Sequence, residues 1–277
     1  MKTRIITGAV LVAIALPILI FSEYIVYPIF LSVLAAVAMV ELYKCIGLLD
    51  KFHLSVPSAV LAAAMPILVY FFGNEGLVNA VLVFSLASVV LLFYYFGAAV
   101  VAKGEIRFDS VAVAFTLTVY VTSGFSSLSA LRYIPLGGYC IVLIFFASWI
   151  CDTMAYFFGS RFGKHKLIPE VSPKKSVEGA IAGVISSGLV CGIYGLVVDL
   201  VTDGIKVNCI SLVVAGLLLS VVSQFGDLIA SLIKREHGIK DYGSIFPGHG
   251  GVMDRFDSML AVALPLLLIC IAFPPFS

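Results

Sequence analysis

The chain has 277 residues, of which 61% are hydrophobic and only 12% are charged, and its formal net charge is +1. A soluble domain needs roughly 25% charged residues and a disordered chain combines low hydrophobicity with high charge, so both classes are excluded. The remaining class is a polytopic membrane protein, all-α because lipid offers exposed backbone groups no hydrogen-bond partner.

Nine apolar segments approach the length of about 20 residues that a membrane-spanning helix requires. The first follows a basic start, as in a signal peptide, but it has no small-x-small cleavage site and is expected to remain as an uncleaved span. We predict one integral-membrane domain, residues 1–277, built as a bundle of about nine transmembrane helices. Their expected ranges are 5–22, 27–46, 57–73, 77–101, 110–130, 137–160, 178–199, 207–234 and 252–273.

The positions of Lys and Arg predict the orientation, because these residues accumulate in cytoplasmic loops. With the N-terminus inside, only Arg132 and Lys206 fall on the outer side, so the N-terminus is predicted to be cytoplasmic and the C-terminus outside. The inner loops at 161–177 and 235–251 hold more basic residues than topology requires, which indicates a cytoplasmic anion site. Residues 1–140 are therefore interpreted as scaffold helices with potential oligomer contacts, and residues 141–277 as the catalytic helices and loops.

The eighth span carries a polar stripe on one helical face, formed by Ser220, Gln224, Asp227, Ser231 and Lys234 at intervals of three or four residues. An acid inside a span costs about 2.5–3.5 kcal/mol on insertion scales and usually has a function. Asp227 is roughly 10 Å along the helix from Lys234. The alternative is a helix-packing stripe in which Asp227 pairs with a lysine elsewhere.

Three further acids fall in or beside apolar segments. Asp254 and Asp257 share a face of the first turns of the ninth span, and Asp152 lies in the sixth span. Carboxylate oxygens brought together in this way are what a hard divalent cation requires. The alternatives are acids favoured by the helix dipole and neutralised by Arg255, and a structural hydrogen-bonding role for Asp152.

Two loops contain groups that could bind phosphate. In "FPGHGGVMD", Gly250 and Gly251 precede a helix start, where backbone N–H groups and the helix dipole attract anions. The other basic loop supplies Lys174, Lys175 and Ser176. The alternatives are an ordinary glycine-rich turn, with His249 as a turn residue, and a basic anchor at the membrane surface.

Together these groups predict one site, where acids, basic residues and a glycine loop meet at the cytoplasmic mouth of an apolar bundle. Such a site suits a phosphorylated lipid that meets a metal-bound, phosphate-rich, water-soluble partner. Nucleic acid is not expected as a partner, because no basic face studded with aromatic residues is present. The sequence also lacks the GxSxG motif of acyl-transfer enzymes.

The C-terminal half resembles the phosphatidate cytidylyltransferase (CDP-diacylglycerol synthase) family. The family pattern S-x-x-K-R-x4-K-D, a glycine or small residue, then P-x-H-G-G-x-x-D-R-x-D is present throughout 231–257, and "CDTMAYFFGSRFGKHKL", "VSPKKSVEG" and "SQFGD" extend the resemblance. Residues 1–140 resemble the family only in being hydrophobic spans. The fixed positions are Ser231, Lys234, Arg235, Lys240, Asp241, Gly243, Pro247, His249, Gly250, Gly251, Asp254, Arg255 and Asp257.

The resemblance implies that CTP and phosphatidic acid react to give CDP-diacylglycerol and pyrophosphate with Mg²⁺, and a second cation is left open. It implies Asp227 and Asp254 as primary metal ligands, with Asp257 and Asp152 next. The remaining catalytic and substrate-binding residues implied are Lys234, Arg235, Arg255, Lys174, Lys175, Ser176, Ser231, Lys240, Asp241, His249, Gly250 and Gly251.

Two other classes of membrane protein are alternatives. A CDP-alcohol phosphotransferase would carry D-G-x2-A-R-x8-G-x3-D-x3-D, which is absent. A transporter of an anionic substrate would show duplicated halves with broken helices, whereas the polar residues here crowd into one half. The expected partners are CTP, phosphatidic acid and the lipid bilayer, with a homodimer left open. The expected location is the bacterial cell (inner) membrane, with the active site on the cytoplasmic side.

Overall fold

The structure, a computed structural model, describes residue 13 and residues 17–277. Eleven of the 18 residues of the first predicted span, 5–22, lie outside the described residues, so this span and its retention as an uncleaved segment stay predictions. Within the described part of the chain, eight helical segments are long and apolar enough to cross a membrane. The all-α, polytopic membrane architecture is confirmed, and its orientation across the membrane stays a prediction.

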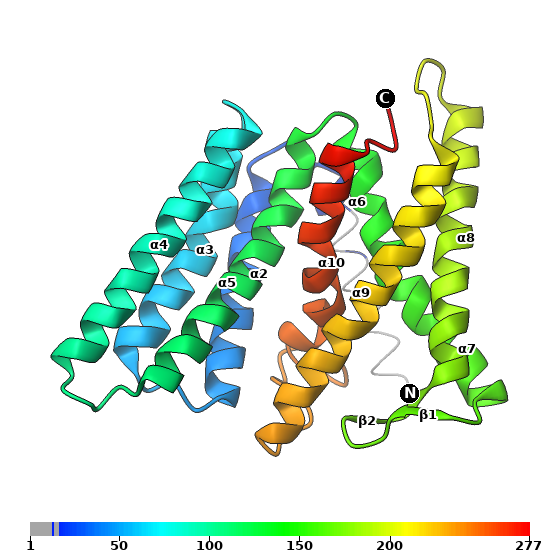
Figure 1. The fold of residues 1–277 in the computed structure, drawn as a ribbon. Helices are drawn as coiled ribbons and strands as arrows, with labels where there is room; N and C mark the ends of the chain where they lie inside the picture. The colour runs from blue at the N-terminus through cyan, green and yellow to red at the C-terminus, as the bar shows by residue number, and fades with distance from the viewer. Residues whose placement is uncertain (1–12, 14–16) are drawn as a thin grey trace. The chain divides into compact units, whose positions relative to one another are not determined.

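Each predicted span from the second to the ninth coincides with one helical segment (Figure 1). A run long enough to cross the bilayer must satisfy its own backbone groups, which an α-helix does. The largest difference in a boundary is at the third span, where the helix begins at Phe52 and includes Pro57. The continuous helices are α2 (Val26–Cys45), α3 (Phe52–Gly73), α4 (Leu77–Val101), α5 (Phe108–Ala130), α8 (Val177–Val201), α9 (Cys209–Glu236) and α10 (Met253–Ala272).

The sixth span is not one continuous α-helix. It consists of α6 (Gly137–Phe145), the π-helical turn η2 (Phe146–Ile150) and α7 (Cys151–Phe162), and it follows the 3₁₀ turn η1 (Leu131–Tyr133). A π turn adds a residue to the helical winding, and such turns often occur at functional sites. Here the turn sets the direction of the first turn of α7, which carries Asp152.

The basic loop after α7 contains a β-hairpin that the sequence analysis did not predict. Strands β1 (Lys166–Ile168) and β2 (Ser172–Ser176) are antiparallel, and Figure 1 shows the hairpin between the end of α7 and the start of α8. Glu178, in the first turn of α8, accepts hydrogen bonds from the backbone N–H groups of Lys164 (3.1 Å) and His165 (3.2 Å). This carboxylate therefore fastens the chain before β1 to the start of α8.

The described residues group into two compact units. The first contains the chain up to Tyr133 together with His237–Phe256, and the second contains Ile134–Glu236 and Asp257–Ser277. Each unit thus includes part of the C-terminal half of the chain. The predicted functional division of the single domain, into residues 1–140 and residues 141–277, stays a prediction.

A buried network of hydroxyl groups joins α2, α3, α4 and α5 in the first unit. The Tyr43 hydroxyl on α2 lies 3.0 Å from Thr118 Oγ1 and donates to the Ala114 carbonyl on α5 at 3.1 Å. Ser58 on α3 bonds to Tyr43 and Thr118, and Tyr95 on α4 donates to a carbonyl of α3 at 2.9 Å. Hydrogen bonds between helices stabilise association in lipid, where the hydrophobic effect cannot.

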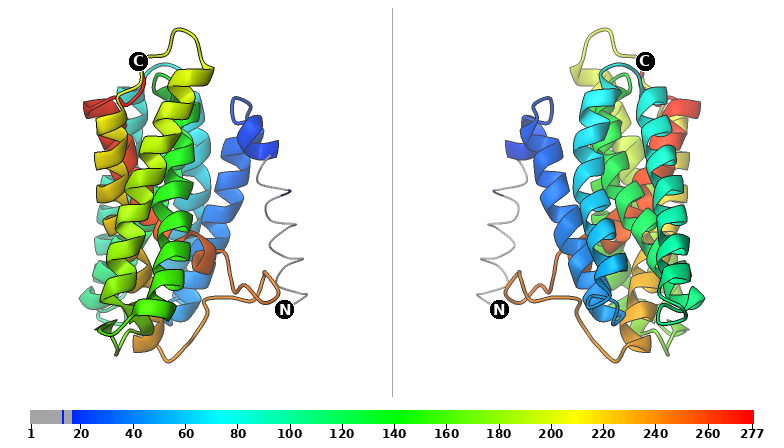
Figure 2. Two further views of the ribbon diagram at one scale, coloured as in Figure 1. Left: turned by 90° about the vertical axis from the view of Figure 1, so that its right-hand side faces the viewer. Right: turned by 90° about the vertical axis from the view of Figure 1, so that its left-hand side faces the viewer.

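In the second unit, small residues allow close packing of the helices that carry the predicted site. A Cβ atom added at Gly216 of α9 would meet Cys191 of α8, and one at Gly188 would meet Leu217. Helices α7 and α8, which lie side by side in Figure 2, are equally close, since a Cβ at Gly183 would meet Cys151. Small residues at helix contacts are typical of membrane proteins.

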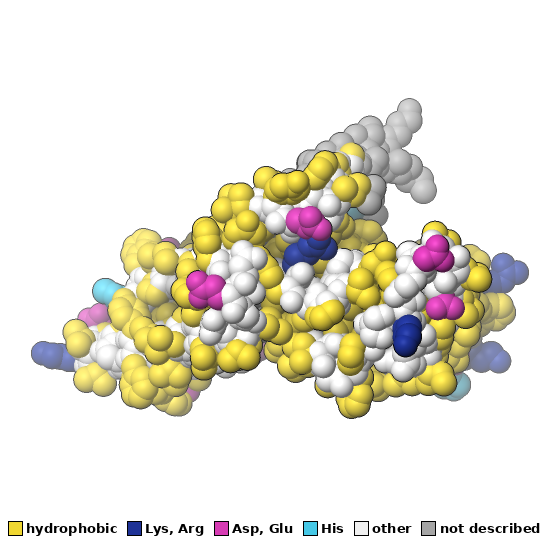
Figure 3. Space-filling view, turned by 90° about the horizontal axis from the view of Figure 1, so that it is seen from above, with side chains coloured by type: hydrophobic (Ala, Val, Ile, Leu, Met, Phe, Trp, Pro, Cys, Tyr) yellow, Lys and Arg dark blue, Asp and Glu magenta, His cyan; other side chains and the backbone are white. Residues whose placement is uncertain are grey.

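The exposed surface is mainly apolar. In the view of Figure 3 hydrophobic side chains predominate and charged ones are few. Large apolar side chains are exposed along the helices, including Leu86 on α4 and Leu200 on α8. Exposed apolar surface on this scale would be covered by lipid or protein, so the chain is an integral membrane protein.

Candidate active site

Three of the predicted metal-binding carboxylates come together within the second unit. Asp257 of α10 is buried, with 8% of its surface exposed, and interacts electrostatically with Asp227 of α9 and Asp152 of α7. Lys234, near the end of α9, is also buried and interacts with Asp257. The polar stripe of α9 therefore faces protein, and it brings two of its charged residues to the acid on α10.

Asp227 forms an ion pair with Lys175 of β2, and both side chains are about a quarter exposed (26% and 23%). The hairpin thus supplies the kind of lysine partner that the structural alternative required. Ser176, the next residue, is the N-cap of α8, where its Oγ accepts a hydrogen bond from the Gly179 N–H at 3.2 Å. Because this cap fixes the backbone at the start of α8, it also restrains the neighbouring Lys175 and its ion pair with Asp227.

The loop between α9 and α10 is organised around Asp254, within the first unit. Asp254 Oδ2 accepts hydrogen bonds from the backbone N–H groups of Tyr242 (2.7 Å) and Gly251 (3.0 Å). Gly250 has a φ of +85°, and a Cβ added there would lie 2.7 Å from the same oxygen. The glycine is therefore required by the backbone conformation and by the closeness of Asp254.

The hydrogen bonds of Asp254 limit which N–H groups of the predicted phosphate-binding loop could bind an anion. The Gly251 N–H is bonded to Asp254 in the structure, so this group is satisfied within the protein. His249 Nδ1 is buried and has no hydrogen-bond partner among the described residues. Buried polar atoms are normally hydrogen-bonded, so His249 Nδ1 is the atom of this loop that a bound ligand could satisfy.

Glu41 of α2 also contacts this loop, although it was not among the predicted site residues. Its buried carboxylate accepts hydrogen bonds from the N–H groups of Val252 (3.1 Å) and Met253 (2.9 Å), at the start of α10. It also lies so close to Gly243 and Gly251 that a Cβ at either position would overlap it. An acid inside an apolar span was the available signal, but its partners are more than two hundred residues away.

The other predicted basic residues lie at the surface. Lys174, Arg235, Lys240 and Arg255 are exposed, Asp241 is exposed, and Ser231 is half-buried. Long, exposed basic side chains of this kind can reach the phosphate groups of a ligand without a large desolvation cost.

The chemistry of these carboxylates is compatible with magnesium bound together with a phosphate ligand. Among the described residues, no three His, Cys, Asp or Glu side chains form a ready-made metal site. Magnesium usually keeps several waters and binds through one or two carboxylates together with substrate phosphates. The oxygen ligands of Asp152, Asp227 and Asp257 have the right chemistry for this mode of binding.

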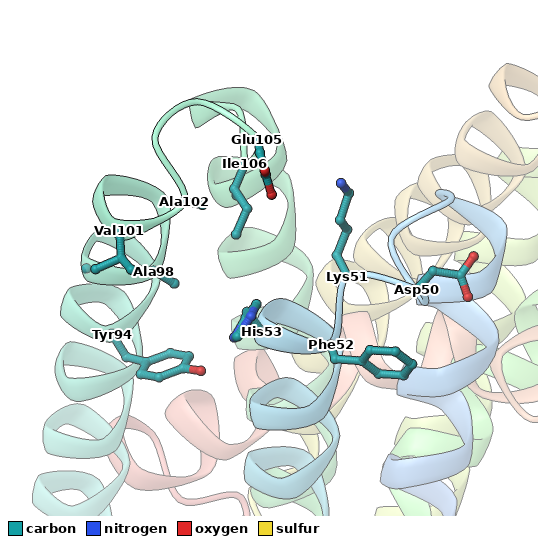
Figure 4. Close-up of a pocket in the computed structure, with 11 residues that line it drawn as sticks. Asp50, Lys51, Phe52, His53, Tyr94, Ala98, Val101, Ala102, Glu105 and Ile106 are labelled. Carbon is teal, nitrogen blue, oxygen red and sulfur yellow. The ribbon is translucent and has the colours of Figure 1, made fainter.

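A cavity of about 660 Å³ lies elsewhere, in the first unit, between the start of α3, the end of α4 and the turn that follows α4. In Figure 4, Tyr94 and His53 point toward each other from α4 and α3, and Lys51 extends away from them. Asp50 and Glu105 add charge of the opposite sign, and no predicted site residue lines this cavity. It is therefore not the candidate active site.

Comparison with known proteins extends the similarity beyond the C-terminal motif. The model of the cytidylyltransferase family matches residues 2–273. Proteins called phosphatidate cytidylyltransferase are 36% identical in Staphylococcus epidermidis (over 275 residues; 97% of this chain, 98% of that protein) and 34% identical in Bacillus subtilis (over 286 residues; 98% of each). The family model thus includes residues 2–140, where the sequence alone showed a resemblance only in hydrophobicity.

Proposed function

The chain belongs to the cytidylyltransferase family, and we propose on this premise that it is a phosphatidate cytidylyltransferase. It transfers the cytidylyl group of CTP to phosphatidic acid, which gives CDP-diacylglycerol and pyrophosphate. The observation that carries this proposal is the nearly full-length match to relatives of that name, together with the complete motif at 231–257.

The reaction requires positioning and charge neutralisation more than proton transfer. An ionised oxygen of the phosphatidate phosphate attacks the α-phosphorus of CTP, and the bond from this phosphorus to the oxygen that bridges it to the β-phosphate breaks. Pyrophosphate leaves with that electron pair. Because the nucleophile is already ionised, no strong base is needed, and the chief demand is to hold several negative phosphates together.

The second unit supplies groups suited to that demand. One or two of the carboxylates Asp227, Asp257 and Asp152 would hold Mg²⁺, which would supply positive charge to the reacting phosphate oxygens when bound. Lys175 and Lys234 stand next to these acids, through an ion pair and an electrostatic contact respectively. An incoming phosphate offers each ammonium group a second anionic partner, so both lysines can stabilise substrate without leaving the carboxylates.

Asp254 remains a proposed ligand on sequence grounds, because it precedes Asp257 by three residues in α10 and so shares its helical face. Its contacts with Tyr242 and Gly251 support an additional role, which is to hold the loop that carries His249. His249 is proposed to position substrate through its buried Nδ1.

The exposed basic residues are proposed to bind the triphosphate or the lipid phosphate. They are Lys174, Arg235, Lys240 and Arg255, with Ser231, Asp241 and Gly250 as further substrate contacts. Ser176 acts chiefly as the cap of α8, which supports Lys175. We place the protein in the bacterial inner membrane with this site on the cytoplasmic side, because the basic loops favour that side. A homodimer is not required by the proposal.

The test is to measure pyrophosphate and CMP in one reaction of purified protein with CTP, phosphatidate and Mg²⁺. We expect pyrophosphate only when both substrates are present. In a parallel reaction supplied with CDP-diacylglycerol and an alcohol acceptor instead, release of CMP by a protein that forms no pyrophosphate in the first reaction would identify a phosphotransferase. Transport of an anionic substrate without cleavage of any phosphoanhydride would identify a transporter. Either result would contradict the proposal.

A further inference from the structure

We propose that an apolar groove between α8 and α9 binds an acyl chain of the lipid substrate next to the phosphate, and thereby sets the chain length that the enzyme prefers. The groove has a volume of about 430 Å³, within the usual range of ligand pockets. It is lined by Ala180 and Val184 of α8, by Val221 and Phe225 of α9, and by Leu167 and Ile168 of β1. This inference rests on the proposed function.

The chemistry of the groove selects a hydrocarbon. Gln224 is the lining side chain that carries a polar group, and its Nε2 already donates to the Ala180 carbonyl at 3.1 Å. A nucleotide base or a sugar would bring several polar groups into the groove, and most would lack hydrogen-bond partners, which is costly. The groove therefore excludes CTP and accepts an acyl chain.

The location of the groove ties it to the phosphate-binding groups. Gln224 and Asp227 are three residues apart on α9, so they are neighbours on one helical face. Asp227 pairs with Lys175 of β2, and β1, the partner strand of β2, supplies Leu167 and Ile168 to the groove. A lipid whose phosphate is held near Lys175 would thus have the first part of an acyl chain at the mouth of the groove.

The groove is open to the hydrocarbon of the membrane. Ile181, Ile185 and Phe225, which border it, are each more than half exposed. An acyl chain can therefore enter sideways from the leaflet without passing through water. The stretch of α8 from Ala180 to Ile185 is roughly 8 Å long, so an acyl chain shorter than this leaves part of the groove empty, whereas a longer chain fills it.

Two substitutions test the groove, with a matched control. Val184→Phe should fill it, whereas Leu189→Phe adds the same ring to an exposed position of α8 outside it. We expect Val184→Phe to raise the KM for long-chain phosphatidate about tenfold, in line with the discrimination that small changes in apolar pockets produce. The KM for CTP and the turnover of a short-chain phosphatidate should stay within about twofold of wild type. Leu189→Phe should change neither.

The wild-type protein provides a second test that does not depend on the folding of a variant. Phosphatidate with a photoreactive diazirine close to the ester is cross-linked, and the labelled peptides are identified by mass spectrometry. We expect labels in 177–201 and 209–236, reduced by an excess of ordinary phosphatidate. Labels confined to other helices, or equal labelling by a phosphatidylcholine probe, would overturn the inference.

Failure of this inference can be distinguished from failure of the proposed function. If the wild-type protein releases no pyrophosphate from CTP with phosphatidate, the proposed function is wrong. If it does so while Val184→Phe alters all chain lengths equally, or none, only the acyl-chain groove is wrong.

Discussion

The buried carboxylate of Glu41 allows a test of whether the loop between α9 and α10 must be held in place for activity. Glu41→Gln keeps the size of the side chain and one carbonyl acceptor, but it replaces the other oxygen by an NH₂ group. That group would face the N–H of Val252 or Met253, which now bond to the carboxylate at 3.1 and 2.9 Å. Two donors would then meet in a buried position.

The size of the effect follows from these two contacts. A hydrogen bond to a charged group contributes about 1.5–3 kcal/mol, and a buried donor left without an acceptor costs about 1–3 kcal/mol. We therefore expect the held arrangement of the loop to lose about 2–4 kcal/mol relative to its released state. Since tenfold in an equilibrium corresponds to about 1.4 kcal/mol, the population of the held loop, and with it kcat/KM, should fall by up to about 30-fold for a loss of about 2 kcal/mol.

The assay is pyrophosphate release by detergent-purified protein, with the thermal midpoint of unfolding measured in parallel. Glu75→Gln is the matched control, because Glu75 is exposed in the turn between α3 and α4. It should leave kcat/KM unchanged. If Glu41→Gln retained kcat/KM within twofold of wild type, the view that this carboxylate holds a catalytic loop would be refuted.

Three further predictions concern the site and its orientation. Asp227→Asn and Asp254→Asn should each abolish nearly all turnover, because a negative charge is lost without a change of shape. The purified variants should stay monodisperse on gel filtration. Substantial residual turnover in either would contradict the ligand assignment. Gly250→Ala should lower kcat/KM more than Gly238→Ala does. Both substitutions strain a backbone with positive φ, but only the Cβ at 250 would contact Asp254. Equal effects would argue against that contact. A cysteine placed at Lys240, with the native cysteines removed, should react with an impermeant thiol reagent only after cells are opened, and labelling of intact cells would overturn the predicted orientation.

Much of the fold could be predicted from the sequence, because one physical demand determines it. A chain in lipid must bond its backbone internally, so hydrophobic length alone located α2 to α10 within a few residues. The π turn at Phe146–Ile150 and the hairpin at 166–176 were not predicted. Both depend on local backbone geometry that leaves no strong periodic pattern in the sequence.

The candidate site was predictable in its residue types but not in its contacts. Charge in an apolar span identified Asp227 and Asp257, and the sequence left open a lysine partner for Asp227 without indicating which. The structure identifies Lys175, brought close by the hairpin. Glu41, an acid inside an apolar span, met the same criterion and was missed, but its contacts with the start of α10 could not be predicted, because no local pattern reports a contact over that separation.

The most direct test of the central claim is to follow the label from CTP into lipid. Purified protein is incubated with phosphatidate and Mg²⁺, in parallel with CTP labelled at the α-phosphate and CTP labelled at the γ-phosphate. We predict that α-label appears in a lipid that co-migrates with CDP-diacylglycerol, in equal molar amount to the pyrophosphate released, and that γ-label appears only in pyrophosphate. Lipid labelled from the γ-position would show phosphoryl rather than cytidylyl transfer, and no labelled lipid from either would show that the protein does not join these substrates; both results would contradict the account.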